Sequence, residues 1–232
     1  MNKIIAPLFI FFSVLLSVFS SCEKNEGYTA TTDSISSLPE ITFSDIDGNV
    51  YHGVYIGSQI WSKENLRVTR YRDGTPLTEI TDQVLWNGMS DTMPLYCTYN
   101  NDAYLGIQYG KLYNRYVIYD TLPIAPAGWR VPTIADWDTL FTYLGGAAVA
   151  SSKMREAGTD HWIGPNNSTN TSKFTALGGG FRDALGFSHL SVRGKFWCMW
   201  PFVAYQLDGS SAVLSDSTEE RTAGYSIRLI KN

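Results

Sequence analysis

Residues 128–145 read Gly-Trp-Arg-Val-Pro-Thr-Ile-Ala-Asp-Trp-Asp-Thr-Leu-Phe-Thr-Tyr-Leu-Gly and carry the clearest helix signal of the chain. Thr133, followed three residues later by Asp136, predicts an N-cap that satisfies free N–H groups and complements the helix dipole. Apolar residues then recur at helical spacing and predict one buried stripe: Ile134, Trp137, Leu140, Phe141 and Leu144. Because so short a helix is marginal alone, we expect this stripe to dock on the strand-rich remainder of the chain.

The segments on either side predict one more helix and many short strands. A second helix is expected over residues 147–157, with Gly158 ending it. Trp86 falls in a predicted loop, and the aromatic-dense residues 109–119 predict a helix leading into a strand. Segments bounded by turn residues predict strands at 41–43, 50–56, 59–62, 174–182, 192–200, 203–207, 212–215 and 225–230.

Composition limits the class of protein. The 232 residues are 44% hydrophobic and 14% aromatic, which is enough to bury the core of one large domain behind a leader. The net charge is −4, and Lys and Arg form no run. Nucleic acid is therefore excluded as an expected partner, because its binders present basic patches.

The N-terminus has the pattern of a secretory leader. Lys3 precedes an apolar run from Ile4 to Phe19, and Ser20-Ser21-Cys22 follows. Small residues directly before a cysteine resemble the bacterial lipobox, so we expect residues 1–21 to be a lipoprotein signal peptide and Cys22 to carry lipid. The alternative is an ordinary leader cut nearby, with Cys22 incidental.

A lipid on Cys22 implies that the protein contacts the membrane through its N-terminus alone. Residues 22–39 are rich in Ser and Thr and poor in apolar residues, a composition typical of a linker. The acidic Glu23-Lys24-Asn25-Glu26 resembles the stretch that favours outward export in Bacteroidetes lipoproteins. The expected location is therefore the outer membrane, with the domain either exposed at the cell surface or facing the periplasm.

Ordered blocks of aromatic, glycine and polar residues run through the rest of the chain. They are Asp45-x-Asp-Gly-Asn-x-Tyr51, Trp61-x-x-Glu-Asn-Leu66, Asp73-Gly-Thr-Pro76, Tyr96-Cys-x-Tyr-Asn-Asn-Asp102, Tyr109-Gly-x-Leu-Tyr-Asn114, Pro126-x-Gly-Trp-x-Val-Pro132 with Asp136-Trp137, Gly158-Thr-x-His-Trp162, Phe174-Thr-Ala-Leu177 with Gly179-Gly-Phe-Arg182, and Tyr225-Ser-Ile-Arg228. Together they resemble the Fibrobacter succinogenes major paralogous domain, which occurs on secreted and lipid-anchored proteins of Bacteroidetes and Fibrobacteres. The resemblance covers roughly residues 44–231.

The resemblance implies a fold for residues 40–232. The Gly-Trp-Arg-Val-Pro block, Gly-Gly-x-Arg182 and Ser-x-Arg228 are also similar to the superfamily of C-type lectins and formylglycine-generating enzymes. That similarity implies an α+β, C-type-lectin-like fold with two helices packed on irregular short antiparallel sheets with long loops. Family members usually carry cysteines where this chain has Ala125 and Leu229, so the bridge that such a pair would form is missing here.

Two cysteines remain in the domain, Cys97 and Cys198. In an oxidising compartment they could form a disulfide, or they could be two buried thiols among aromatic neighbours. Catalysis by either is not expected, because no local basic residue would ionise the thiol.

Metal sites and cofactors are not expected either. His52, His161 and His189 lack zinc-ligand spacing and are expected to be structural or at the surface. Asp45, Asp47 and Asn49 could offer oxygens to calcium, as could Asn100-Asn101-Asp102, but turn chemistry explains both clusters. Gly178-Gly-Gly180 indicates close backbone approach rather than phosphate binding.

The expected function is non-enzymatic binding of a glycan or a protein partner. Tryptophan rings could stack on sugar faces, and the candidates are Trp86, Trp162, Trp197 and Trp200, although most tryptophans in so aromatic a domain belong to the core. One alternative is a structural subunit of a surface assembly. Another is an enzyme of the formylglycine-generating type, against which the missing cysteine pair argues, or a glycosidase, which would need two facing carboxylates.

Overall fold

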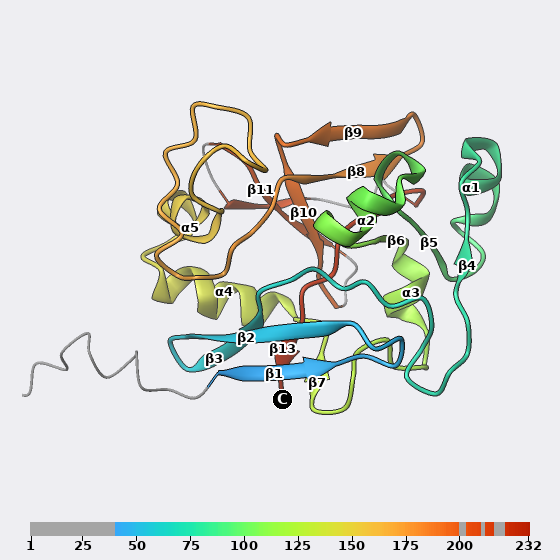
Figure 1. The fold of residues 1–232 in the computed structure, drawn as a ribbon, viewed down its shortest axis with the longest axis horizontal. Coiled ribbons are helices and arrows are strands. Elements are labelled where there is room, and N and C mark those ends of the chain that lie inside the picture. Colours follow the sequence, from blue (N-terminus) through green and yellow to red (C-terminus); the bar gives the residue numbers. More distant parts are fainter. Residues whose placement is uncertain (1–39, 200–202, 210–211, 216–220) are drawn as a thin grey trace, which may run out of the picture. The chain divides into compact units, whose positions relative to one another are not determined.

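The computed structural model describes residues 40–199, 203–209, 212–215 and 221–232, which belong to the compact unit Pro39–Asn232 (Figure 1). The predicted leader 1–21, the linker 22–39 and Trp200 lie outside the described residues. The elements in order are β1 (Ile41–Ser44), β2 (Val50–Ile56), β3 (Gln59–Ser62), β4 (Thr78–Glu79), α1 (Gln83–Met89), β5 (Leu95–Cys97), the 3-10 turn η2 (Tyr99–Asn101), α2 (Ala103–Tyr109), β6 (Leu112–Tyr113), α3 (Arg115–Tyr119), β7 (Trp129–Arg130), α4 (Ile134–Tyr143), α5 (Ala147–Met154), β8 (Gly179–Asp183), β9 (Gly186–Leu190), β10 (Gly194–Trp197), β11 (Ala204–Leu207), β12 (Ala212–Ser215) and β13 (Ile230–Lys231).

The described strands form three small sheets, and with the helices they confirm an α+β fold. The strand orders are β1-β2-β3-β13-β7, β12-β11-β10-β8-β9 and β4-β5-β6. Most neighbours are antiparallel, but β4 with β5 and β8 with β10 run parallel. The expected short antiparallel sheets are therefore present, and these two pairs are the exceptions to the antiparallel order. None of the described helices has the length and apolarity needed to cross a bilayer.

Helix α4 confirms the prediction made for residues 128–145. The Thr133 hydroxyl accepts from the Asp136 N–H, and the Asp136 carboxylate accepts from the Thr133 N–H at 2.7 Å, which completes a capping box. Trp137, Leu140, Phe141 and Leu144 are buried. The centre of the Trp137 ring lies 4.8 Å from that of Trp61, in β3, and 5.2 Å from that of Tyr205, in β11. The apolar stripe of α4 therefore packs against both of the larger sheets.

Several predicted elements are wrong in type or extent. Trp86 lies in helix α1, whose N-cap is Asp82, and residues 117–119 belong to helix α3 rather than to a strand. Helix α5 ends at Met154 instead of residue 157, because Arg155 is extended and bridges to Ala176. The described residues thus hold five α-helices where the family resemblance implied two. The additional ones, α1, α2 and α3, span five to seven residues, too few to show a helical period.

The predicted strands at the C-terminal half are confirmed only in part. β8 begins at Gly179 rather than at residue 174, and strand β9 was not predicted at all. Gly180 confirms the expected close approach: its φ is +62°, and a Cβ there would lie 2.6 Å from the Ser188 carbonyl oxygen. β8 and β9 can therefore pair closely only with glycine at this position.

Two buried arginines, both from motif blocks, tie distant segments together. Arg228 donates to the carbonyl oxygens of Ser62, Phe174 and Thr175 and to the Asn65 side chain. Its guanidinium lies 4.6 Å from the centre of the Phe174 ring. Arg182 donates to the carbonyl oxygens of Ile80 and Thr81 and to the side chain of Gln83, at the start of α1. Because each guanidinium replaces water with protein oxygens, burial is tolerated and the loops are fixed.

Candidate functional site

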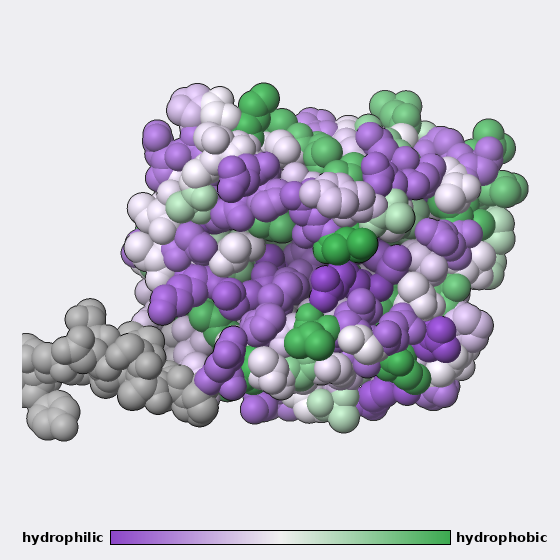
Figure 2. Space-filling view, viewed as in Figure 1, coloured by the Kyte–Doolittle hydropathy of each residue, from purple (hydrophilic) through white to green (hydrophobic). Residues whose placement is uncertain are grey.

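A polar groove runs beside α2 and consists of two adjoining hollows, of about 230 Å³ and about 720 Å³. Figure 2 shows a hydrophilic depression on the face that carries α2 and β2. Arg67 and Ile107 line both hollows and mark their boundary. The smaller hollow is completed by Lys63, Glu64, Asn65, Gln108, Gly110, Glu156, His161, Thr175 and Leu177, and the larger by Asp47, Asn49, Thr69, Arg70, Glu79, Thr98, Asn101, Ala103, Gly106 and Lys111.

Helix α2 forms one wall, and local chemistry fixes its position. The Asp102 carboxylate caps it by accepting from the Tyr104 N–H at 2.7 Å. Gly106 faces Thr98 so closely that a Cβ would lie 2.4 Å from the Thr98 methyl carbon. Gly110 ends the helix at φ +81°, and a Cβ there would lie 2.6 Å from that of Asn65. Gly106 thus allows α2 to lie against the residue that follows β5, and Gly110 allows its end to lie against the segment that follows β3.

Arg67 lies where the two hollows meet, and the protein holds it without neutralising it. Its Nη2 donates to the Val50 carbonyl oxygen at 2.8 Å, and its guanidinium lies 5.3 Å from the centre of the Tyr51 ring. That ring is fixed in turn, because its hydroxyl donates to Asp45 at 2.6 Å. Within the described part of the chain, no group accepts from Nη1 or from the buried Nε, and no carboxylate pairs with Arg67. The guanidinium is therefore positioned with unused donors.

The other charged groups of the larger hollow are already matched. Burial opposes ionisation of Asp47, but hydrogen bonds from Thr69 and the charge of Arg70 hold its pKa below the usual value. Lys111 lies 4.7 Å from the centre of the Tyr96 ring, and burial lowers its pKa while Glu79 acts in the opposite direction. Asp47 is thus paired with Arg70, and Glu79 acts on Lys111 without an ion pair between them. Arg67 has no carboxylate partner among the described residues.

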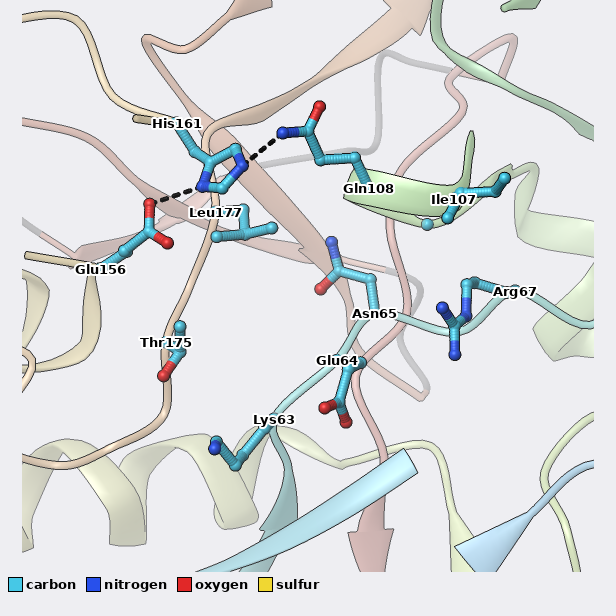
Figure 3. A pocket seen from close by; sticks show the side chains of 11 residues that line it. Lys63, Glu64, Asn65, Arg67, Ile107, Gln108, Glu156, His161, Thr175 and Leu177 are labelled. Carbon is cyan, nitrogen blue, oxygen red and sulfur yellow. Dashed lines mark hydrogen bonds and ion pairs between the residues drawn. The ribbon is translucent and has the colours of Figure 1, made fainter. Parts of the chain in front are cut away.

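The smaller hollow contains a histidine that is fully occupied by its neighbours (Figure 3). His161 Nδ1 lies 2.7 Å from a Glu156 carboxylate oxygen, and its Nε2 contacts the Gln108 amide nitrogen. These contacts fit a neutral ring that donates to Glu156 and accepts from Gln108. The Glu64 carboxylate is occupied as well, because it accepts from the His52 N–H at 2.8 Å and contacts the His52 ring. His161 is therefore structural here, as predicted.

Helix α2 exposes two large side chains, and one of them, Ile107, lines the groove. Ile107 is 68% exposed, and Tyr104, one turn earlier on α2, is 69% exposed. Residues three apart on a helix share a face, so Tyr104 projects from the same side of α2 as Ile107, beyond the residues that line the hollows. Neither residue was predicted from the sequence. The available signal was Asp102 as an N-cap, which starts a helix too short to show a period.

The tryptophans predicted to bind a ligand are in the core instead. Trp86 is 0% exposed, Trp162 is 2% exposed and Trp197 is 1% exposed. Each indole N–H donates to a backbone carbonyl, of Thr222, Ala176 and Tyr113 respectively. The prediction that these three tryptophan rings stack on a ligand is therefore wrong. The sheets are small, and large rings are needed to cover them. Trp200 lies outside the described residues.

The two cysteines are free and buried rather than bridged. Burial raises the pKa of the Cys97 thiol to about 11, although Arg182 acts in the opposite direction. Burial raises the pKa of the Cys198 thiol to about 12, and nearby Asp136 adds to this effect. Both are therefore protonated at neutral pH, and the thiolate is the nucleophilic form.

Turn chemistry accounts for the clusters that could have offered oxygens to calcium. Asp45 accepts from the backbone N–H groups of Asp47 and Asn49, both at 3.0 Å, and from the Tyr51 hydroxyl. Asp102 caps α2, and Asn101 donates to the Thr81 carbonyl oxygen. Across residues 40–232, outside the short gaps in the description, no three acidic, histidine or cysteine side chains gather in a way that could hold a metal ion.

Comparison with known proteins places the chain in a family. No curated protein matches it, and neither does any solved structure. The sequence model of the Fibrobacter succinogenes major domain matches residues 54–231, which include α1 to α5, both buried arginines and every groove residue except Asp47 and Asn49. Since this match covers well over half of the 232 residues, the chain belongs to the Fibrobacter succinogenes major domain family.

Proposed function

We propose that this protein is a lipid-anchored, non-catalytic binding protein that recognises a glycan in the groove beside α2. The observation that carries the proposal is a groove lined mostly by polar and charged residues, with Ile107 exposed in it and Tyr104 exposed on the same face of α2. A sugar presents hydroxyls around its ring and an apolar face of C–H groups. Polar side chains satisfy the former, and an aromatic ring covers the latter.

The dimensions of the groove favour a small ligand rather than a protein surface. The larger hollow, at about 720 Å³, lies within the range of roughly 300–1,000 Å³ typical of ligand pockets. The smaller hollow continues it past Arg67. A chain of two or three sugar units would occupy both, with Tyr104 stacked on one ring.

The state of the reactive groups favours binding over catalysis. The two carboxylates of the smaller hollow, Glu64 and Glu156, are each held by a histidine. A glycosidase needs one carboxylate free to protonate the leaving group and another free to act as base or nucleophile. Protonated, buried Cys97 and Cys198 provide no nucleophile for chemistry of the formylglycine-generating type.

A C-type-lectin-like fold is part of the same proposal. Its support is the pair α4 and α5, which contact each other and lie beside short sheets, together with the long connection between α5 and β8. The motif blocks that imply this superfamily lie at structural positions: Thr133 and Asp136 cap α4, and Arg182 and Arg228 tie loops.

The anchor and the surface location rest on the lipobox-like Ser20-Ser21-Cys22. Acyl chains on Cys22 supply the membrane affinity, so Cys22→Ser is expected to convert a detergent-partitioning protein into a soluble or unprocessed one. Detergent partitioning of the full chain, followed by immunoblot, measures this. Unchanged partitioning of the variant would show that Cys22 carries no anchor.

A glycan array tests the binding function directly. The unit Pro39–Asn232 is expected to bind a defined set of glycans, and Tyr104→Ala to lose them, because the stacking ring is gone. Tyr143→Ala is the matched control, since Tyr143 is 61% exposed on α4, outside the groove. An array without signals, or signals that Tyr104→Ala leaves intact, would refute the proposed site.

A further inference from the structure

We infer that the glycan recognised in this groove is acidic, and that a carboxylate or sulfate group of the glycan binds to Arg67. This inference rests on the proposed function and adds the chemical class of the ligand. It starts from the junction of the two hollows, which Arg67 shares with Ile107.

The first support is the hydrogen-bonding state of the guanidinium. Arg228 and Arg182 each donate at least three hydrogen bonds to chain oxygens, so their donors are used inside the protein. Arg67 donates one from its side chain, to the Val50 carbonyl oxygen at 2.8 Å. In the described residues nothing accepts from Nη1, which leaves it available to a planar anion.

The second support is the rigidity of Arg67. Its own N–H donates to the Tyr51 hydroxyl at 2.9 Å, and its guanidinium lies over the same ring. The Tyr51 hydroxyl in turn donates to Asp45, and Tyr51 is 0% exposed. A cation held by an immobile aromatic ring loses little conformational entropy when a ligand binds.

The third support is the charge balance of the groove. Three cationic side chains and two carboxylates line the larger hollow: Arg67, Arg70, Lys111, Asp47 and Glu79. Asp47 is paired with Arg70 at 2.7 Å, and Glu79 lies close enough to Lys111 to influence its pKa. Within the larger hollow the surplus positive charge therefore resides at Arg67. The smaller hollow adds Lys63 and two carboxylates, Glu64 and Glu156, which each contact a histidine and not Arg67. An acidic group is the ligand chemistry that neutralises the charge of Arg67.

The experiment compares one polysaccharide with and without its charge. Polygalacturonate carries a carboxylate on each unit, and fully methyl-esterified polygalacturonate keeps the same backbone without the charge. The full chain is expected to bind the acid form at least about ten-fold more tightly, which is the value of one charge-assisted hydrogen bond. Carrageenan, which carries sulfate, and neutral dextran complete the series and distinguish a sulfate from a carboxylate.

Two arginine variants connect any preference to the residue. Arg67→Gln is expected to bring the affinity for the acid form down to that for the ester, whereas Arg72→Gln, an exposed neighbour outside the groove, keeps the preference. The far-UV spectrum and melting curve of Arg67→Gln establish that it is folded. Should it fail to fold, the wild-type preference for acid over ester still decides the inference.

Each other result has a definite meaning. Equal binding of acid, ester and dextran would overturn the acidic ligand and leave the proposed glycan site standing. Binding of a peptide through its terminal carboxylate, with no polysaccharide bound, would overturn both. An acid preference that Arg67→Gln retains would also overturn the inference, because the anion would then bind elsewhere.

Discussion

Arg228 lies in the core beside α4 and donates four hydrogen bonds to oxygens of the chain, whereas Arg67 in the groove donates one from its side chain. Both guanidiniums lie over aromatic rings, Phe174 for Arg228 and Tyr51 for Arg67. Arg228 is 0% exposed, and Arg67 faces two hollows. The same residue type is thus used in two ways within one domain.

The difference separates groups that hold the fold from groups that remain available to a ligand. In the core, burial of a charge is tolerated because chain oxygens replace water around it. In the groove, a positioned donor without a partner gains nothing for stability and gains binding free energy when an acceptor arrives. Substitutions in the core should therefore change mainly the free energy of unfolding, and substitutions in the groove should change mainly binding.

The largest expected effect is in the core. Trp137→Ala removes a ring that contacts Trp61, Phe141, Phe174, Phe196 and Tyr205, and it should lower the free energy of unfolding by about 3–5 kcal/mol. Trp137→Phe is the matched control. It keeps an aromatic ring and removes a buried indole N–H that has no partner among the described residues, so it should cost less than about 1.5 kcal/mol. Urea denaturation measures both, and an unchanged midpoint for Trp137→Ala would show that the ring does not support the core.

The second prediction compares the two arginines directly. Arg228→Met leaves the oxygens of Ser62, Phe174 and Thr175 without their donor, and it should cost about 3 kcal/mol. Arg67→Met removes one hydrogen bond to Val50 at a partly exposed position and should cost about 1 kcal/mol or less. Urea denaturation measures both variants. Equal losses of unfolding free energy for Arg228→Met and Arg67→Met would contradict the distinction between core and groove.

The third prediction concerns pH and the N-terminus of α4. Burial opposes ionisation of Asp136, but hydrogen bonds from Arg130 and Thr133 outweigh it and lower its pKa from 3.8 to about 2. Because the pKa is lower in the folded state, the stabilisation is complete above about pH 4 and is lost as the pH falls toward 2. It amounts to about 1 kcal/mol, because Arg130 is partly exposed and solvent screens the pair.

Asp136→Asn tests this assignment. The free energy of unfolding of wild type should fall between pH 4 and pH 2 more steeply than that of the variant, so that the difference between them shrinks in acid. Parallel curves for the two proteins would show that the Asp136 carboxylate is not specifically stabilised by its neighbours.

The smallest expected change is the stability of the groove variants. Tyr104→Ala removes an exposed side chain from α2, and it should alter the free energy of unfolding by less than about 0.5 kcal/mol. Thermal melting beside Tyr143→Ala, its matched control on α4, measures this. A large loss would mean that Tyr104 packs as part of the fold.

The core beside α4 could be predicted from the sequence because its signals are local and periodic. Thr133, Asp136 and the apolar stripe specify one capped helix with one buried face, and a hydrophobic face must dock. The α+β class was predicted in a different way, from the resemblance of the motif blocks to a known family. The helices α1, α2 and α3 were missed, because five to seven residues show no period.

The groove could not be predicted, because its residues come from distant parts of the chain. Arg67, Ile107 and Glu156 share a hollow only after α2 has packed against the segment following β3 and the loop after α5 has folded over it. The tryptophans misled for a related reason. The sequence shows that a tryptophan ring is large and amphipathic. Whether that ring is buried depends on the area of the sheets that it covers in the folded domain.

The central claim is that the groove beside α2 binds a ligand without supporting the fold. The most direct test is a glycan array probed with wild type and with the double variant Tyr104→Ala, Arg67→Gln at equal folded concentration. The account predicts that the double variant loses every glycan that wild type binds while its melting temperature falls by no more than about 5 °C. A double variant that keeps the wild-type array profile would contradict it.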